Sequence, residues 1–171
     1  MVYILGFHRL ISNINKLIAV FLSILFLALL FSMGYEVFSR YVLMSSTSWV
    51  YEASKMTFGF VAIWGGGYTL LKGDHINIDL FYDKWEGLFK RNIKHVNFLF
   101  FVFYISFLIY LSFYDSLNSF NLKETANSTL SQPLYHWRIS LVVGLVMLFF
   151  QGVAEYLMSI FDLESKYAFK Y

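Results

Sequence analysis

The sequence predicts an all-α integral membrane protein with four transmembrane helices and one further helix in the membrane interface. Its composition is strongly apolar, and the few charges gather between long charge-free stretches. The chain of 171 residues is 58% hydrophobic and only 14% charged, with a mean hydropathy of +0.59. A soluble domain is about half apolar and about one quarter charged, so lipid is needed to cover the excess apolar surface. We expect residues 1–171 to form a single membrane domain.

Four segments are long and apolar enough to cross the hydrocarbon core, which takes roughly 20 residues of helix. We predict transmembrane helices at about residues 17–40, 52–72, 96–115 and 137–161. The second has the shortest charge-free stretch and is rich in glycine. The fourth contains Glu155 near its end, where a carboxylate can reach the interface or pair without the cost of about 2.5 to 3.5 kcal/mol expected at the bilayer centre.

The distribution of positive charge predicts the orientation, because the cytoplasmic loops of membrane proteins carry an excess of Lys and Arg. A cytoplasmic N-terminus places nine of the thirteen Lys and Arg residues on that side: Arg9, Lys16, Lys72, Lys84, Lys90, Arg91, Lys94, Lys166 and Lys170. Both termini are therefore expected to be cytoplasmic.

The segment between the second and third spans has the pattern of an amphipathic helix at about residues 79–94. Its apolar residues recur at helical spacing with charged residues between them: Phe81, Trp85, Leu88, Phe89 and Ile93. Such a helix lies in the headgroup plane, and Asp79 is a candidate N-cap. A loop with ordinary interfacial aromatic residues is the alternative.

No pattern in the sequence is typical of a catalytic, substrate, metal or cofactor site. The absence of cysteine excludes disulfides and thiolate ligands. The histidines at positions 8, 75, 95 and 136 lie at or beyond the expected helix ends, whereas a bis-histidine haem needs ligands that face each other inside the bundle. We expect no enzymatic activity, no cofactor, no metal and no nucleic-acid partner.

Small residues in the second and fourth spans favour close helix packing. Ala62 and Gly66 lie four residues apart, as do Ser140 and Gly144, and such spacing lets two helix backbones approach each other. The helix-packing candidates are Ala62, Gly65, Gly66, Gly67 and Gly144. A self-sufficient transporter usually shows ionisable groups near the centres of its spans and an internal repeat. The spans of this chain have neither feature. We therefore expect a subunit that works with a larger protein.

Four residues gather at the expected outer boundary of the membrane: Arg40, Trp49, Glu52 and Lys55. Tryptophan favours the headgroup region, and Glu52 can pair with Lys55 three residues later or with Arg40 across the hairpin. Glu36 and Arg40 also have the favourable i,i+4 order for a helical ion pair. These residues serve either as a structural ion pair within the subunit or as a contact with a partner.

Five short motifs follow one another along the chain. They are Phe38–Tyr41, Ser48–Glu52, Trp64–Gly67, Lys72–Asp79 and Pro133–Trp137. In order and spacing they resemble the small membrane subunit of tripartite ATP-independent periplasmic (TRAP) transporters. In that family an arginine ends the first span, Trp-x-x-Glu opens the second, and a Gly-x-His-Ile-x-x-Asp-like segment follows.

The resemblance implies a small subunit in the bacterial inner membrane, bound to a large multi-helix permease that holds the substrate and sodium sites. Some small subunits of this kind are fused to the large one, but this chain ends ten residues after Phe161, so we expect a separate polypeptide. A periplasmic binding protein delivers the substrate, and the small subunit scaffolds the permease and helps to dock the binding protein. Sialic acid and a C4-dicarboxylate are both plausible cargo, and membrane lipid is a further partner. Two other classes stay open: a membrane anchor of a redox enzyme, and a small transporter that works alone as a homo-oligomer.

Overall fold

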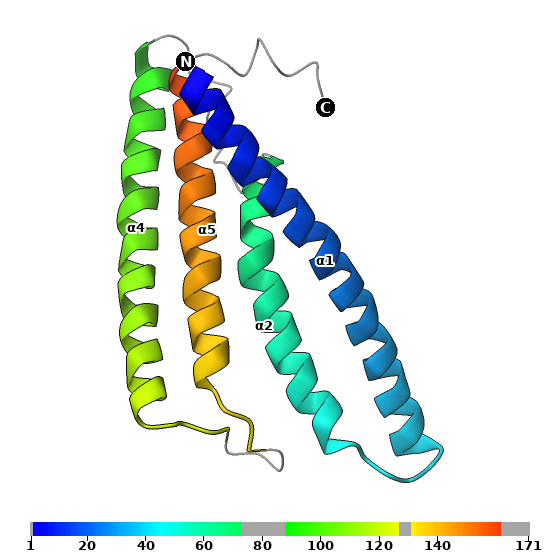
Figure 1. Cartoon of the computed structure of the whole chain (residues 1–171). Helices are drawn as coiled ribbons and strands as arrows, with labels where there is room; N and C mark the ends of the chain where they lie inside the picture. The colour runs from blue at the N-terminus through cyan, green and yellow to red at the C-terminus, as the bar shows by residue number, and fades with distance from the viewer. Residues whose placement is uncertain (1, 73–87, 127–130, 162–171) are drawn as a thin grey trace.

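The described part of the chain is helical apart from its turns and connections. The computed structural model describes residues 2–72, 88–126 and 131–161. Within them lie four helices: α1 (Val2–Tyr41), α2 (Ser48–Leu71), α4 (Leu88–Asn121) and α5 (Tyr135–Ile160). The helices α1 and α4 run in one direction, whereas α2 and α5 run in the opposite direction (Figure 1). The prediction of an all-α fold with four long helices is confirmed for these residues.

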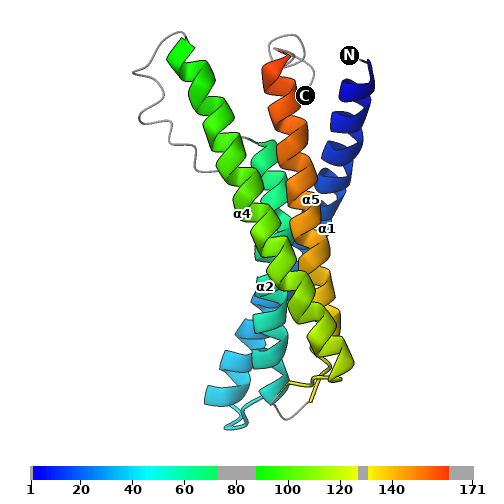
Figure 2. The same ribbon diagram turned by 90° about the vertical axis from the view of Figure 1, so that its left-hand side faces the viewer.

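The two helical hairpins turn at the same end of the bundle, which we call the hairpin end. There α1 ends and α2 begins, and α4 ends and α5 begins (Figures 1 and 2). At the opposite end, called the terminal end, α1 begins and α5 finishes. Polar groups at the two ends of the bundle therefore come from different parts of the sequence.

Three of the helices have the length and composition of membrane spans: Tyr3–Tyr41, Ile93–Asn121 and Tyr135–Ile160. Helix α2 is 24 residues long, which gives about 36 Å of helix and is enough to cross a bilayer by length. Its hydropathy is lower because three successive glycines and the charged residues Glu52 and Lys55 lie among its apolar residues. The expected fourth span is thus present as a helix whose composition alone does not mark it as a span.

Two helices extend beyond the expected boundaries. Helix α1 begins at Val2 rather than near residue 17, and α4 ends at Asn121 rather than near residue 115. Residues 88–94, assigned above to an interfacial helix at 79–94, form the first turns of α4 without a break. The rest of that predicted helix lies outside the described residues. Charges mark where the hydrocarbon ends, and a helix can continue past that boundary.

Helix α5 is at the centre of the packing. It contacts α1, α2 and α4, while α2 also packs along α1. Its residues are more buried than those of α1 and α4, whose outer faces expose large apolar side chains such as Leu17, Phe31, Phe103 and Tyr110. Exposed apolar surface of this extent is typical of helices that face lipid or another membrane subunit.

Candidate partner interface

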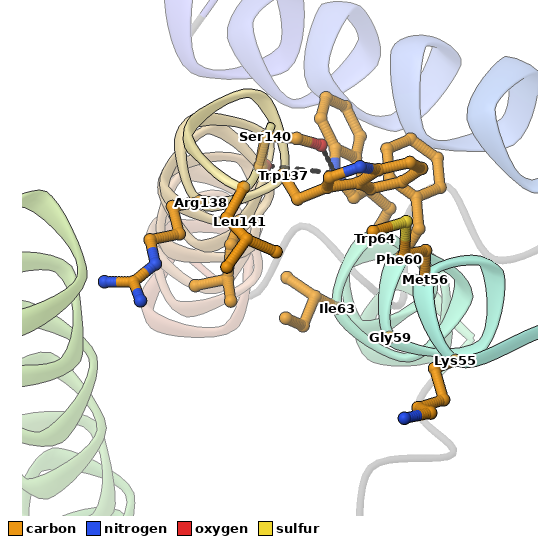
Figure 3. A pocket seen from close by; sticks show the side chains of 11 residues that line it. Lys55, Met56, Gly59, Phe60, Ile63, Trp64, Trp137, Arg138, Ser140 and Leu141 are labelled. Atoms are coloured by element: carbon orange, nitrogen blue, oxygen red, sulfur yellow. Dashed lines mark hydrogen bonds between the residues drawn. The ribbon is translucent and has the colours of Figure 1, made fainter. Parts of the chain in front are cut away.

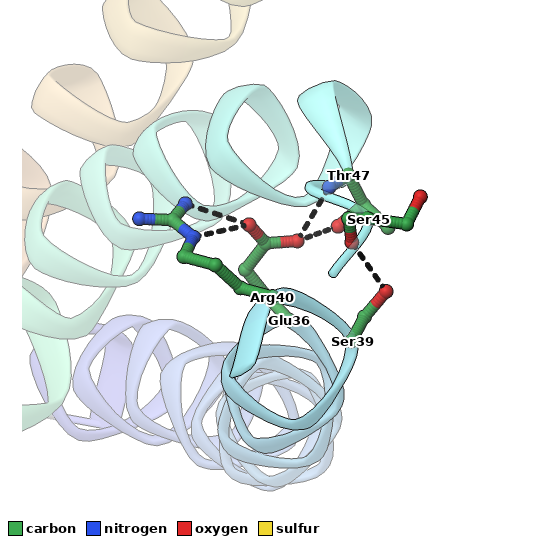
Figure 4. Close-up of polar contacts among 5 residues, drawn as sticks. All are labelled: Glu36, Ser39, Arg40, Ser45 and Thr47. Atoms are coloured by element: carbon green, nitrogen blue, oxygen red, sulfur yellow. Dashed lines mark hydrogen bonds and ion pairs between the residues drawn. The ribbon is translucent and has the colours of Figure 1, made fainter. Parts of the chain in front are cut away.

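The connection between α1 and α2 is fixed by Glu36, which lies in the last turns of α1. One carboxylate oxygen, Oε1, accepts hydrogen bonds from Arg40 Nη2 at 2.7 Å and from Arg40 Nε at 3.3 Å. The other, Oε2, accepts from the Thr47 backbone N–H at 2.9 Å and from the Thr47 hydroxyl (Figure 4). Because Thr47 is the N-cap of α2, one side chain ties the end of α1 to the start of α2.

A second set of bonds closes the same connection. The Ser39 hydroxyl donates to the Ser45 carbonyl at 2.6 Å, and the Ser45 N–H donates to the Ser39 carbonyl at 3.1 Å. Met44 has a φ of 52°, a left-handed conformation that costs free energy and persists only where surrounding contacts enforce it. We call Glu36, Ser39, Arg40, Ser45 and Thr47 the hairpin cluster, and it holds the connection in one conformation.

The four boundary residues lie at the end of α1 and in the first half of α2, and of the pairs expected among them and Glu36 only one forms. Arg40 pairs with Glu36, and no ion pair joins Glu52 to Arg40 or to Lys55. The Lys55 Nζ instead lies 4.0 Å from the ring centroid of Tyr51, a cation–π contact.

Glu52 is an unusual member of this group because its side chain is buried. The residue is only 8% exposed, and its Oε2 has no hydrogen-bond partner among the described residues. A buried polar atom without a partner costs free energy, so this oxygen would gain from a donor that the described part of the chain does not supply. Trp49, three residues earlier in the first turn of α2, is about half exposed.

Exposed apolar side chains project around the hairpin cluster. We call residues 41–44 the apolar tip; its members Tyr41, Val42, Leu43 and Met44 are all exposed, Met44 by 86%. An apolar patch beside polar groups on a fixed connection is typical of an interaction surface. The hairpin end thus combines a hydrogen-bonded connection, exposed apolar groups and one buried carboxyl oxygen without a partner among the described residues.

A polar network that the sequence analysis missed lies toward the terminal end. Asn15 Nδ2 donates to Gln151 Oε1 at 2.8 Å, and Gln151 Nε2 donates to Glu155 Oε1 at 2.6 Å. The same Glu155 oxygen lies 3.1 Å from His8 Nε2. The i,i+4 spacing of Gln151 and Glu155 and the i,i+7 spacing of His8 and Asn15 each place two polar groups on one helix face. This spacing of polar residues was the feature of the sequence from which the network could have been predicted.

The helix-packing candidates fall into two groups. A Cβ at Gly144 would lie 2.8 Å from Ile63 Cγ2, and one at Gly67 would collide with the Asn15 side chain, so the helices approach closely at both positions. At Gly65 and Gly66 an added Cβ would make only ordinary contacts, and Ala62 is exposed.

The partner of the small surface on α5 is a tryptophan. Trp64 Nε1 donates to the backbone carbonyl and the hydroxyl oxygen of Ser140, each at 3.1 Å. Its ring also lies beside Gly144, where a larger residue would displace it. The Ser140–Gly144 surface thus accommodates an indole side chain, whereas Ala62 and Gly66 do not pack into it.

Comparison with known protein families identifies the chain. Residues 29–161 match the family described as tripartite ATP-independent periplasmic transporters, DctQ component. The matched segment runs from within α1 to the end of α5 and includes the hairpin cluster and the contact between α2 and α5. No curated protein matches the chain. Because the match covers most of the sequence, the chain belongs to the DctQ-component family of TRAP transporters.

Proposed function

We propose that this small permease subunit scaffolds a large multi-helix permease and helps to dock the periplasmic binding protein of its transporter. The cargo is an organic acid, such as sialic acid or a C4-dicarboxylate, taken up together with sodium. The family match supports the membership of this chain in such a complex. The observation that carries the docking role is the hairpin end, where a fixed connection presents the exposed apolar tip and the start of α2 holds a buried oxygen of Glu52 without a partner among the described residues.

The same proposal makes α2 the fourth membrane span. Helices α1 and α4 have the composition of spans and run in the same direction, so the chain has to cross back between them (Figure 1). Helix α2 runs the opposite way and is long enough to do so. With more Lys and Arg toward the terminal end, that end is cytoplasmic and the hairpin end is periplasmic.

The scaffold role is supported by the outer faces of α1 and α4. These helices flank the α2–α5 pair and expose apolar side chains along most of their length. A second membrane protein can pack against such a face without the burial of any charge. The small subunit then widens the rigid part of the transporter, while substrate and sodium bind in the large permease.

Substitutions at the hairpin end test the docking role. We expect Trp49→Ala and Glu52→Gln in the tagged subunit to reduce the recovery of the large permease or the binding protein from gently solubilised membranes, without a change in substrate preference. Leu122→Ala and Asp115→Asn are controls, because they truncate an apolar side chain and remove a carboxylate at exposed positions at the same end of the bundle. A change in substrate preference, or equal recovery with all four variants, would contradict the docking role.

A further inference from the structure

A small pocket lies between α2 and α5 near the hairpin end. Its volume is about 200 Å³, and it is lined by residues between Lys55 and Trp64 of α2 and between Leu134 and Leu141 at the start of α5. Figure 3 shows Ile63 of α2 and Leu141 of α5 facing each other across the gap, with the side chains of Lys55 and Arg138 extending outward from the two helices. The pocket thus has apolar walls and a basic mouth.

The two basic residues at the mouth differ in their partners. Arg138 Nη2 lies 3.0 Å from Glu124 Oε2, so its charge is largely neutralised within the subunit. Lys55 contacts the Tyr51 ring, and no carboxylate in the described part of the chain pairs with it. The mouth therefore carries one uncompensated positive charge, which suits an anionic group such as a phosphate.

The dimensions of the pocket exclude a protein helix as its occupant. A helix with its side chains is about 10 to 12 Å across, too wide for this volume. From Lys55 to Ile63 the pocket follows α2 for two turns, about 12 Å, which is less than half of a hydrocarbon core of about 30 Å. A ligand with its charged group at Lys55 and its chain beside Ile63 would therefore occupy one leaflet.

Gly59 provides the surface along which such a chain would lie. It lines the pocket, and a Cβ built there would have no atom within 4 Å. The glycine is therefore not needed for close packing within the subunit, unlike Gly144. Trp137 also lines the pocket, and tryptophan favours the level of the lipid headgroups.

We propose that this pocket binds one acyl chain of a phospholipid in the periplasmic leaflet, with the phosphate at Lys55. The inference rests on the membrane crossing of α2 that is part of the proposed function. The lipid fills the outer half of the α2–α5 contact and neutralises Lys55. It is a structural ligand of the subunit and is distinct from the transported organic acid.

Quantification of phospholipid that stays bound after purification in mild detergent tests this site. We expect the native subunit to retain phospholipid that Gly59→Leu loses, because a Cβ at this position meets no atom within 4 Å and the longer side chain extends from the wall of the pocket. Lys55→Gln should weaken retention roughly fivefold, the effect of one lysine near an anionic phosphate. Gly34→Leu and Lys123→Gln are matched controls; no atom lies within 4 Å of a Cβ at Gly34, and Lys123 is exposed in the other connection.

The same preparations separate failure of the lipid site from failure of the proposed function. Equal lipid retention by all variants, or displacement of the lipid by inorganic phosphate alone, would overturn the lipid site. A photo-reactive residue at position 59 that cross-links to the large permease instead of lipid would do the same. If the permease is recovered with no bound lipid, the lipid site is wrong and the proposed function stands. If lipid is bound but no permease is recovered, the proposed function is wrong and the lipid site stands.

Discussion

Asn15 on α1 donates a hydrogen bond to Gln151 on α5 at 2.8 Å, although 136 positions separate them in sequence. Gln151 is 0% exposed and Asn15 is 1% exposed, so water has no access to either side chain. In a membrane protein, a polar pair of this kind fixes the rotation of one helix against another, because few other donors are available. The bond therefore sets how the first half of α1 packs on α5.

Loss of this bond should destabilise the subunit. We expect Asn15→Ala and Gln151→Ala each to lower the free energy of unfolding in detergent by about 1 to 2 kcal/mol, because each leaves a buried polar group without its partner. A double-mutant cycle should give a coupling of about 0.6 kcal/mol and at most about 1.7 kcal/mol. Asn13→Ala, at an exposed position on the same helix, is the control. Strictly additive effects would show that the two side chains do not interact.

The hairpin cluster should depend on Glu36 more than on Arg40. Glu36→Ala removes the acceptor for the Thr47 N–H, a bond to a charged group worth about 1.5 to 3 kcal/mol. Hydrogen exchange at the Thr47 amide should therefore become at least about tenfold faster. Arg40→Gln keeps this acceptor and should change the exchange much less. Equal protection in Glu36→Ala and the native chain would mean that Glu36 does not hold the connection.

The proposed topology can be mapped with single cysteines, because the native chain has none. We expect Met44→Cys to react with a membrane-impermeant thiol reagent in intact cells. Tyr3→Cys and Lys72→Cys should react only after the membrane is permeabilised. All three native side chains are exposed, so labelling reports the side of the membrane rather than burial. Labelling of Lys72→Cys from outside would show that α2 does not cross the membrane.

The helices could be predicted from the sequence, but their ends could not. Charge-free stretches locate the hydrocarbon core, and all four predicted spans lie largely within observed helices. Residues 2–16 of α1 and 88–95 of α4 include charged residues and were placed outside the spans, yet they are helical. Helix formation depends on the backbone and on packing against neighbouring helices, such as the contact of His8 with Glu155. Charged residues in the sequence indicate only where the chain leaves the hydrocarbon core.

The candidate site was predicted in part. The spacing of Glu36 and Arg40 was enough to predict their ion pair, because i,i+4 neighbours always share a helix face. Pairing of Glu52 depends on how α2 is rotated against α1, and that rotation cannot be deduced from local spacing. The same holds for Asn15 and Gln151, whose contact requires the register between helices that are distant in sequence.

Affinity purification of the tagged chain from gently solubilised native membranes, with the bound proteins identified by mass, tests the central claim most directly. The proposed function predicts recovery of a much larger hydrophobic permease, with or without a periplasmic binding protein. Recovery of redox enzyme subunits, or of this chain alone as a homo-oligomer that transports substrate in vesicles without partners, would contradict it.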